Sequence, residues 1–279
     1  MDHWKDRGEP GLLRRIGFLF FPRRCLFCDE PVEPDQIACS RCEKELPWVT
    51  DPICPYCGFG MEHCTCLGGL HPLDGNRSVF YYTGLGERGL VRFKFYGRRD
   101  AAYYLAQLLK ASVQRWYGSV AFDGVTCVPM YPDKEAQRGY NQSDLLAAHL
   151  AQGLKLPYDG HLLCKVKDYP AQHKLGSSER RRNVQGAFQM RHPIQEGSVW
   201  LLVDDVFTTG STVQECAKVL KAAGAAQVFS VTLAASYRKG IIVEEKSIVK
   251  PDGCRYNDKR KGKDGLEIPS MSENGGIIP

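Results

Sequence analysis

The chain lacks any apolar run that is long enough to cross a bilayer. A transmembrane helix needs about 20 consecutive apolar residues, and the apolar stretch near the N-terminus, residues 11–21, is short and is interrupted by Arg14 and Arg15. No small-residue cleavage site follows this stretch, so it does not resemble a secretion signal. We therefore expect no membrane span, a cytoplasmic protein, and a short amphipathic segment over residues 1–22.

The chain also lacks a large excess of either charge, because its formal net charge is only +5 over 279 residues. The distribution is more informative than the sum. Residues 1–70 contain eight basic and 11 acidic side chains, whereas residues 86–185 contain 16 basic and nine acidic ones. We therefore expect a site for a polyanion, or a face for nucleic acid, on the second region rather than the first.

Cysteine is frequent only near the N-terminus, where eight of the 12 fall between residues 25 and 66 in four close pairs. Without a secretion signal, such clustering indicates metal binding, and disulfides are the alternative. Taking the pairs in sequence order gives two four-thiolate sites, and we expect one or two structural Zn²⁺ ions. The first set is Cys25, Cys28, Cys39 and Cys42, and the second is Cys54, Cys57, Cys64 and Cys66.

The second cysteine set departs from the usual spacing. Only one residue separates Cys64 from Cys66, so His63 is an alternative ligand. Closed four-thiolate sites leave no coordination position for a substrate, so we expect no zinc-catalysed chemistry in this module over residues 23–70. A DNA-binding zinc ribbon is a second alternative, and the net negative charge of residues 1–70 disfavours it.

Beyond the cysteine module, strand and helix patterns alternate, which predicts an α/β fold with a doubly wound parallel sheet over residues 71–237. The expected strands cover 78–83, 124–129, 162–166, 201–203 and 227–234, and the expected helices cover 87–96, 101–116, 141–153 and 213–223. Residues 238–279 have little apolar periodicity, and we expect a disordered tail there.

The most informative stretch is residues 201–212, an apolar run that ends in two carboxylates and a hydroxyl-rich loop around one glycine. The expected buried strand brings Asp204 and Asp205 to its C-terminal end, where open α/β sheets bind ligands. The loop and the start of the next helix offer hydroxyls and backbone N–H groups to a phosphate. An ordinary strand-loop-helix junction is the alternative.

This stretch resembles the phosphoribosyl-pyrophosphate (PRPP) signature of type I phosphoribosyltransferases. The resemblance implies that Asp204 and Asp205 bind the ribose hydroxyls, for which ionised carboxylates are suitable acceptors. It also implies that the 5′-phosphate lies against Thr208, Thr209, Gly210, Ser211 and Thr212. We expect Mg²⁺ on the pyrophosphate, and we expect Gly210→Val to abolish binding because a side chain would keep the loop from closing around a phosphate.

Residues 128–142 and 165–188, together with the cysteine module, resemble the ComF (ComFC) family from about residue 18 to residue 237. The resemblance implies that Pro129, Met130 and Tyr131 receive the pyrophosphate, and that Arg138 lies in a family-specific element over the site. It also implies a mobile loop that carries Arg180 and closes over PRPP. We expect Arg180 to act with Asp204 and Asp205 in catalysis by stabilising the leaving pyrophosphate; a solvated arginine face is the alternative.

Basic and aromatic side chains interleave over residues 87–99. This pattern is typical of a helix with buried aromatic rings and solvated cations, and a surface that stacks and clamps nucleic acid or a nucleobase is the alternative.

Together these features predict a PRPP-binding, phosphoribosyltransferase-like protein that releases pyrophosphate, but no stretch identifies the acceptor. The family resemblance implies a role in natural transformation. A second hypothesis is therefore a non-catalytic competence protein that binds single-stranded DNA or its phosphates. A third is an assembly protein whose cysteine module docks a partner such as a competence helicase.

Overall fold

The computed structural model describes residues 23–33, 35–64, 66, 72–167 and 184–236. The expected N-terminal segment over 1–22, the loop that carries Arg180 and the expected tail over 238–279 lie outside these residues. No helix in the described part of the chain combines the length and the hydropathy needed to cross a bilayer.

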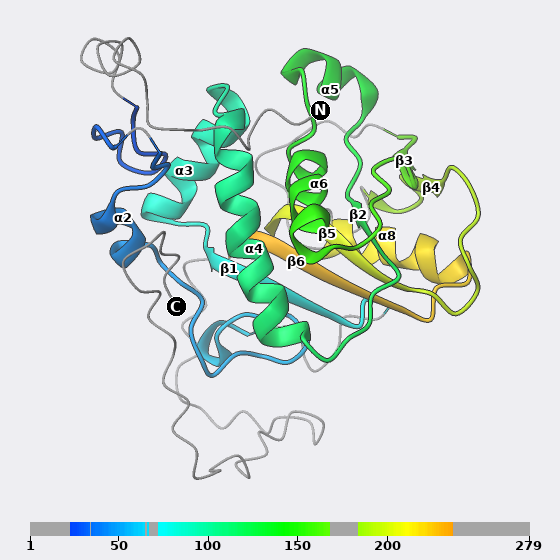
Figure 1. Cartoon of the computed structure of the whole chain (residues 1–279). Helices are drawn as coiled ribbons and strands as arrows, with labels where there is room; N and C mark the ends of the chain where they lie inside the picture. Colours follow the sequence, from blue (N-terminus) through cyan, green and yellow to red (C-terminus); the bar gives the residue numbers. More distant parts are fainter. Residues whose placement is uncertain (1–22, 34, 65, 67–71, 168–183, 237–279) are drawn as a thin grey trace.

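A four-stranded parallel sheet forms the centre of the molecule (Figure 1). Its strands, in spatial order, are β1 (Gly75–Tyr81), β6 (Gln227–Ala235), β5 (Val199–Phe207) and β2 (Gly124–Cys127). The expected strand over 162–166 lies outside this sheet. It becomes β3 (Leu163–Lys165), which pairs antiparallel with β4 (Phe188–Met190).

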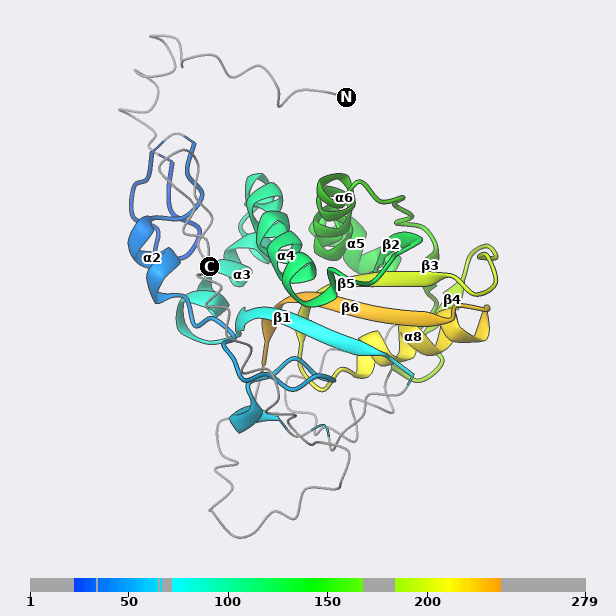
Figure 2. The same ribbon diagram turned by 60° about the horizontal axis from the view of Figure 1, so that its bottom comes forward.

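Helices cover both faces of the parallel sheet, as the alternating pattern predicts (Figure 2). One face carries α4 (Ala102–Tyr117) and α6 (Gln142–Leu154), and the other carries α8 (Ser211–Ala222). The remaining helical segments are α2 (Ser40–Glu45), η1 (Met61–His63), α3 (Gly84–Phe95), η2 (Arg99–Ala101) and α5 (Pro132–Arg138).

The central strand β5 separates two apolar cores. Successive side chains of a strand point to opposite faces, and Leu201 and Val203 accordingly lie in the core beneath α4 and α6. Leu202 lies in the core beneath α8. All three side chains are fully buried, which explains why the sequence of this strand is continuously apolar rather than alternating.

The cysteine-rich segment contributes to both cores. Cys25 and Cys42 belong to the core on the α4 side, whereas Cys54 and Cys57 belong to the core on the α8 side. Residues 23–66 therefore pack along the edge of the α/β unit and reach both of its faces (Figure 2).

Candidate functional site

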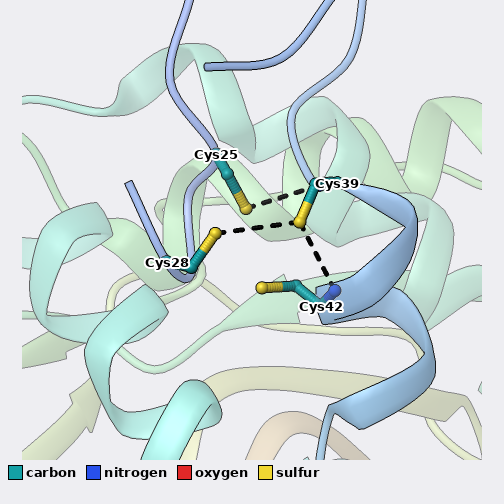
Figure 3. Close-up of side chains that lie close together, drawn as sticks. All are labelled: Cys25, Cys28, Cys39 and Cys42. Atoms are coloured by element: carbon teal, nitrogen blue, oxygen red, sulfur yellow. Dashed lines mark hydrogen bonds between the residues drawn. The ribbon is translucent and has the colours of Figure 1, made fainter. Parts of the chain in front are cut away.

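Each cysteine set is gathered into a compact group of four sulfur atoms that lie within 4.8 Å of one another. Figure 3 shows the first set, in which Cys39 and Cys42 come from the start of α2. The Sγ atoms of Cys28 and Cys39 are 3.7 Å apart, and those of Cys54 and Cys66 are 3.5 Å apart. Tetrahedral Zn²⁺ with bonds of about 2.3 Å would place its sulfur ligands roughly 3.8 Å apart, so both groups fit structural zinc.

His63 is not a member of the second group. Its ring lies edge-on to Tyr81, with the ring centroids 5.2 Å apart. The four thiols brought together are Cys54, Cys57, Cys64 and Cys66, so the short spacing between the last two cysteines does not require a histidine ligand.

The first cysteine set packs against α3 and α4. The ring of Phe27 fits against Gly89 so closely that a Cβ there would lie 2.4 Å from the ring. Arg92 of α3 donates a hydrogen bond to the backbone carbonyl of Leu26 at 3.1 Å. Tyr104 of α4 donates to Glu43 at 3.0 Å. This half of the module therefore holds α3 in place on the sheet.

The second cysteine set packs under the end of β5. Phe59 meets Phe207, the last residue of that strand, with ring centroids 5.7 Å apart and the planes almost perpendicular. Asn76 of β1 donates to the carbonyl of Cys57 at 3.0 Å, and the Gly60 amide donates to the Tyr81 hydroxyl at 3.0 Å. This half of the module therefore supports the place where the hydroxyl-rich loop begins.

The acid pair lies within β5 rather than after it. The expected end of the strand at residue 203 was wrong, because the ladder with β6 continues from Asp204 opposite Thr232 to Phe207 opposite Ala235. Asp204 accepts hydrogen bonds from the Ser143 hydroxyl at 3.0 Å and from the backbone N–H of Asp205 at 2.9 Å.

Asp205 forms an ion pair with Lys94 of α3, at 2.9 Å between Oδ2 and Nζ, and both side chains are only 17% exposed. Burial raises the pKa of Asp204 to about 7, and the neighbouring charge of Asp205 adds to this shift. Hydrogen bonds from the Asp205 amide and from Ser143, and then the charge of Lys94, counteract it. Asp204 therefore takes up a proton readily near neutral pH.

The loop after β5 is shaped by Gly210, whose φ of +72° favours glycine. A Cβ at this position would lie 2.6 Å from the ring of Phe207, so the turn is restricted both by its dihedral angle and by packing. The Thr209 and Ser211 hydroxyls share a hydrogen bond of 2.6 Å. Ser211 begins α8, and the first N–H groups of a helix have no acceptor within it.

Thr208 and Thr212 are half-buried on either side of this turn. The structure therefore brings Thr208, Thr209, Gly210, Ser211 and Thr212 into one segment between the acid pair and the start of α8.

The predicted pyrophosphate loop follows β2, the strand beside β5. The amide of Val128 donates to the carbonyl of Val203 at 2.9 Å, so the half-buried residues Pro129, Met130 and Tyr131 start next to the acid pair. Tyr131 is the N-terminal cap residue of α5.

Arg138 ends α5 and faces the C-terminal end of α3. Its guanidinium group donates to Gln142 at 2.6 Å and lies over the ring of Phe95, 4.8 Å from the centroid. The predicted PRPP contact of Arg138 thus stays a prediction. The predicted catalytic contact of Arg180 falls outside the described residues.

Two neighbours of the acid pair were not singled out from the sequence. Lys94 belongs to the interleaved basic and aromatic stretch, whose pattern could have drawn attention to it. Ser143 follows the Asn141 cap at the start of α6, and no sequence signal linked it to Asp204. Tertiary packing alone joins these residues to the strand that carries the acid pair.

The sequence matches two families in order along the chain. Residues 17–71 match the double zinc ribbon domain, and residues 142–257 match the phosphoribosyl transferase domain. Among full-length relatives, Competence protein F of Haemophilus influenzae is 30% identical over 220 residues, which cover 75% of this chain and 95% of that protein. This chain belongs to the ComF family.

Other relatives match over the same share of the chain. DNA utilization protein YhgH of Salmonella typhimurium is 34% identical, with 75% of this chain and 96% of that protein covered. Competence protein ComFC of Bacillus subtilis is 29% identical, with 75% and 93% covered. A solved structure of the allosteric regulatory enzyme of purine biosynthesis is 21% identical, covers 51% of this chain and 29% of its own, and gives a TM-score of 0.35.

The fold prediction is confirmed. The chain combines an N-terminal cysteine-rich double zinc ribbon with an α/β unit of the phosphoribosyltransferase type, built on a parallel sheet.

Proposed function

We propose that this ComF protein binds PRPP with Mg²⁺ and transfers the phosphoribosyl group to an acceptor with release of pyrophosphate. The observation that carries the proposal is the continuous segment from Asp204 to Ser211, in which a half-buried acid pair is followed at once by a tight hydroxyl-rich turn and a helix N-terminus. The match to the phosphoribosyl transferase domain supports the same function.

The acid pair suits the ribose of PRPP. Ribose hydroxyls donate hydrogen bonds, and carboxylate oxygens accept them. Asp204 already accepts from the Ser143 hydroxyl and Asp205 from the Lys94 ammonium group. A sugar diol would offer donors of the same kind to both carboxylates.

The turn suits the 5′-phosphate. Two hydroxyls meet at Thr209 and Ser211, and the first N–H groups of α8 lie immediately beyond them. Backbone N–H groups at a helix N-terminus and the helix dipole both favour an anion. Mg²⁺ bound to the pyrophosphate of the substrate would offset the repulsion between that group and the carboxylates, and Pro129, Met130 and Tyr131 are the residues we propose for the pyrophosphate side.

The proposal is tested by calorimetry with PRPP and Mg²⁺ on the wild type and on the double variant Asp204→Asn, Asp205→Asn. We expect binding by the wild type and a loss of at least about 100-fold in affinity in the double variant, because two acceptors for the ribose hydroxyls are weakened together. Asp133→Asn is the matched control, since Asp133 is an exposed acid in the first turn of α5. Its affinity should equal that of the wild type, and a wild type that binds no PRPP would refute the proposal.

The names of the relatives support a role in DNA uptake and use, and we include that role in the proposal.

The second candidate is a non-catalytic protein that binds single-stranded DNA, with a competence helicase as a further partner. Exposed Phe95 and Tyr96 favour it, since aromatic rings stack on bases. Several arginines near these rings count against phosphate clamping, because Arg92, Arg98 and Arg99 donate to backbone carbonyls of this chain. Pyrophosphate release from PRPP would separate an enzyme from a binding protein.

A further inference from the structure

Two adjacent aromatic side chains are exposed at the C-terminal end of α3. Phe95 is 65% exposed and Tyr96 is 71% exposed, and they are the most exposed large apolar side chains in the described part of the chain. Single exposed apolar side chains are ordinary, but two at neighbouring positions enlarge the exposed apolar area, and exposed apolar area is the kind of feature that marks binding surfaces. The buried aromatic rings expected for this helix are found only in part, since Phe93 is buried and these two are not.

The exposed pair follows directly after the residue of α3 that contacts the acid pair. Lys94, the residue before Phe95, holds Asp205 at 2.9 Å. On this short helix segment, the ion pair with β5 fixes where the next two side chains emerge. Lys94 is only 17% exposed, so the ion pair is largely shielded from solvent, whereas the two rings next to it are exposed.

A second series of contacts connects the aromatic pair to the acid pair through the start of α6. Arg138 lies over the face of Phe95 at 4.8 Å and donates to Gln142 at 2.6 Å. The next residue after Gln142, Ser143, donates to Asp204 at 3.0 Å. The aromatic pair and the acid pair are therefore linked through both α3 and the start of α6.

One polar group among these contacting residues has no hydrogen-bond partner. The side-chain nitrogen of Gln142 is buried without a hydrogen bond, one of two such side-chain atoms among the residues that the structure describes. A buried donor without an acceptor destabilises the fold, so such a group calls for a functional explanation.

We propose that Phe95, Tyr96 and Arg138 form the stacking platform for the planar ring of the phosphoribosyl acceptor. The inference rests on the proposed function, because an acceptor must reach the ribose that the acid pair holds. Ring faces and a flat guanidinium group attract flat nitrogen-containing rings by stacking and cation–π contact. A free nucleobase and a base in a single strand both carry such a ring, so the experiment has one arm for each source.

The strand arm uses a fluorescein-labelled dT 15-mer and an abasic 15-mer with the same number of phosphates. Both probes offer the same backbone charge, so the difference in affinity isolates contact with the bases. We expect the wild type to bind the dT 15-mer at least about fivefold more tightly than the abasic one, and Phe95→Ala, Tyr96→Ala to remove that preference. Both residues are exposed, so the double variant should melt within a few degrees of the wild type.

The free-base arm measures pyrophosphate release from PRPP and Mg²⁺ with adenine or uracil added. If the acceptor is a free base, one of these should stimulate release, and the double variant should raise its KM at least about fivefold. Tyr103→Ala is the matched control, because Tyr103 is an aromatic residue on α4 that is 44% exposed and packs against His149. The control should behave as the wild type in both arms.

The platform is refuted if the wild type shows neither a preference for bases over the abasic probe nor stimulation by a free base, or if the double variant changes neither. Calorimetry with PRPP on the same proteins keeps the two proposals apart. Failure of the wild type to bind PRPP would refute the proposed function and with it the acceptor role of the platform. PRPP binding by the wild type, together with no effect of the double variant in either arm, would refute the platform alone.

Discussion

Each of the two cysteine sets contains four thiols, and the separations between sulfur atoms are similar in both. The two sets nevertheless support different parts of the molecule. The first set packs on the face that carries α3, α4 and α6, and so holds the helix that supplies Lys94 and the exposed aromatic pair. The second packs on the face that carries α8 and touches Phe207, the residue that restricts Gly210.

This difference teaches that identical metal-site chemistry can serve separate halves of one ligand site. A zinc ribbon makes the apolar segments that pack against it more rigid. Here the segments that pack against the two cysteine sets lie on opposite faces of one sheet. We therefore expect damage to the first set to disturb the ribose and acceptor side, and damage to the second set to disturb the phosphate side.

The largest expected effect comes from losing one ligand of either set. Cys57→Ser and Cys28→Ser should each reduce zinc content by one ion per chain and destabilise the protein by more than about 4 kcal/mol, because structural zinc contributes directly to folding. Zinc analysis and urea unfolding measure these changes. PRPP affinity should fall at least about tenfold in Cys57→Ser and less in Cys28→Ser, and equal losses would contradict the division of labour.

A milder pair of substitutions tests the same division without removing metal. Phe59→Leu and Phe27→Leu each replace a buried aromatic ring beside one cysteine set with a smaller aliphatic side chain. Each should lower the unfolding free energy by about 1–2 kcal/mol. Phe59→Leu should also weaken PRPP binding severalfold, because its ring supports Phe207. Phe27→Leu is its matched control, and a stronger effect on PRPP from this variant would reverse our assignment of the two halves.

The last expected effect concerns the protonation of Asp204 and is confined to a part of the pH range. Its pKa is about 7 in the folded chain against an ordinary value of 3.8, so the folded state binds more protons between these values. Stability should therefore fall as the pH rises from about 4 to 7. Asp204→Asn should raise the unfolding free energy at pH 8 by about 1–3 kcal/mol, with the gain vanishing near pH 4.

Urea unfolding of both proteins across this pH range measures the difference. Asp133→Asn, on the exposed side of α5, should show no such dependence. If the gain in unfolding free energy of Asp204→Asn did not vary with pH, protonation of Asp204 would not be its cause.

Much of the fold could be predicted because local patterns carried it. The apolar run at 201–203 predicted a strand covered on both faces, and its residues divide between the two cores. The spacing of the cysteines grouped them in the same two sets that the structure gathers. Sequence order sufficed in that case because each set closes within fewer than 20 residues.

The rest depended on contacts between distant segments. Ser143 and Asp204 form a hydrogen bond although 61 residues separate them in the sequence. The local sequence around either residue contains no pattern that predicts this contact. The end of β5 was placed too early because charged residues are depleted in strands, and the ladder with β6 overrides that preference. The exposure of Phe95 was likewise hidden, since the same helix pattern fits a buried or an exposed ring.

The contact between Phe59 and Phe207 has a consequence for how the chain is made. The cysteine-rich segment leaves the ribosome well before β5, the strand whose Phe207 covers Phe59. The sheet itself closes late, because Ser78 of β1 meets Thr232 of β6 across 154 residues. Until that last strand emerges, the apolar side of the ribbon is uncovered, so the nascent chain passes through a period of exposure to aggregation.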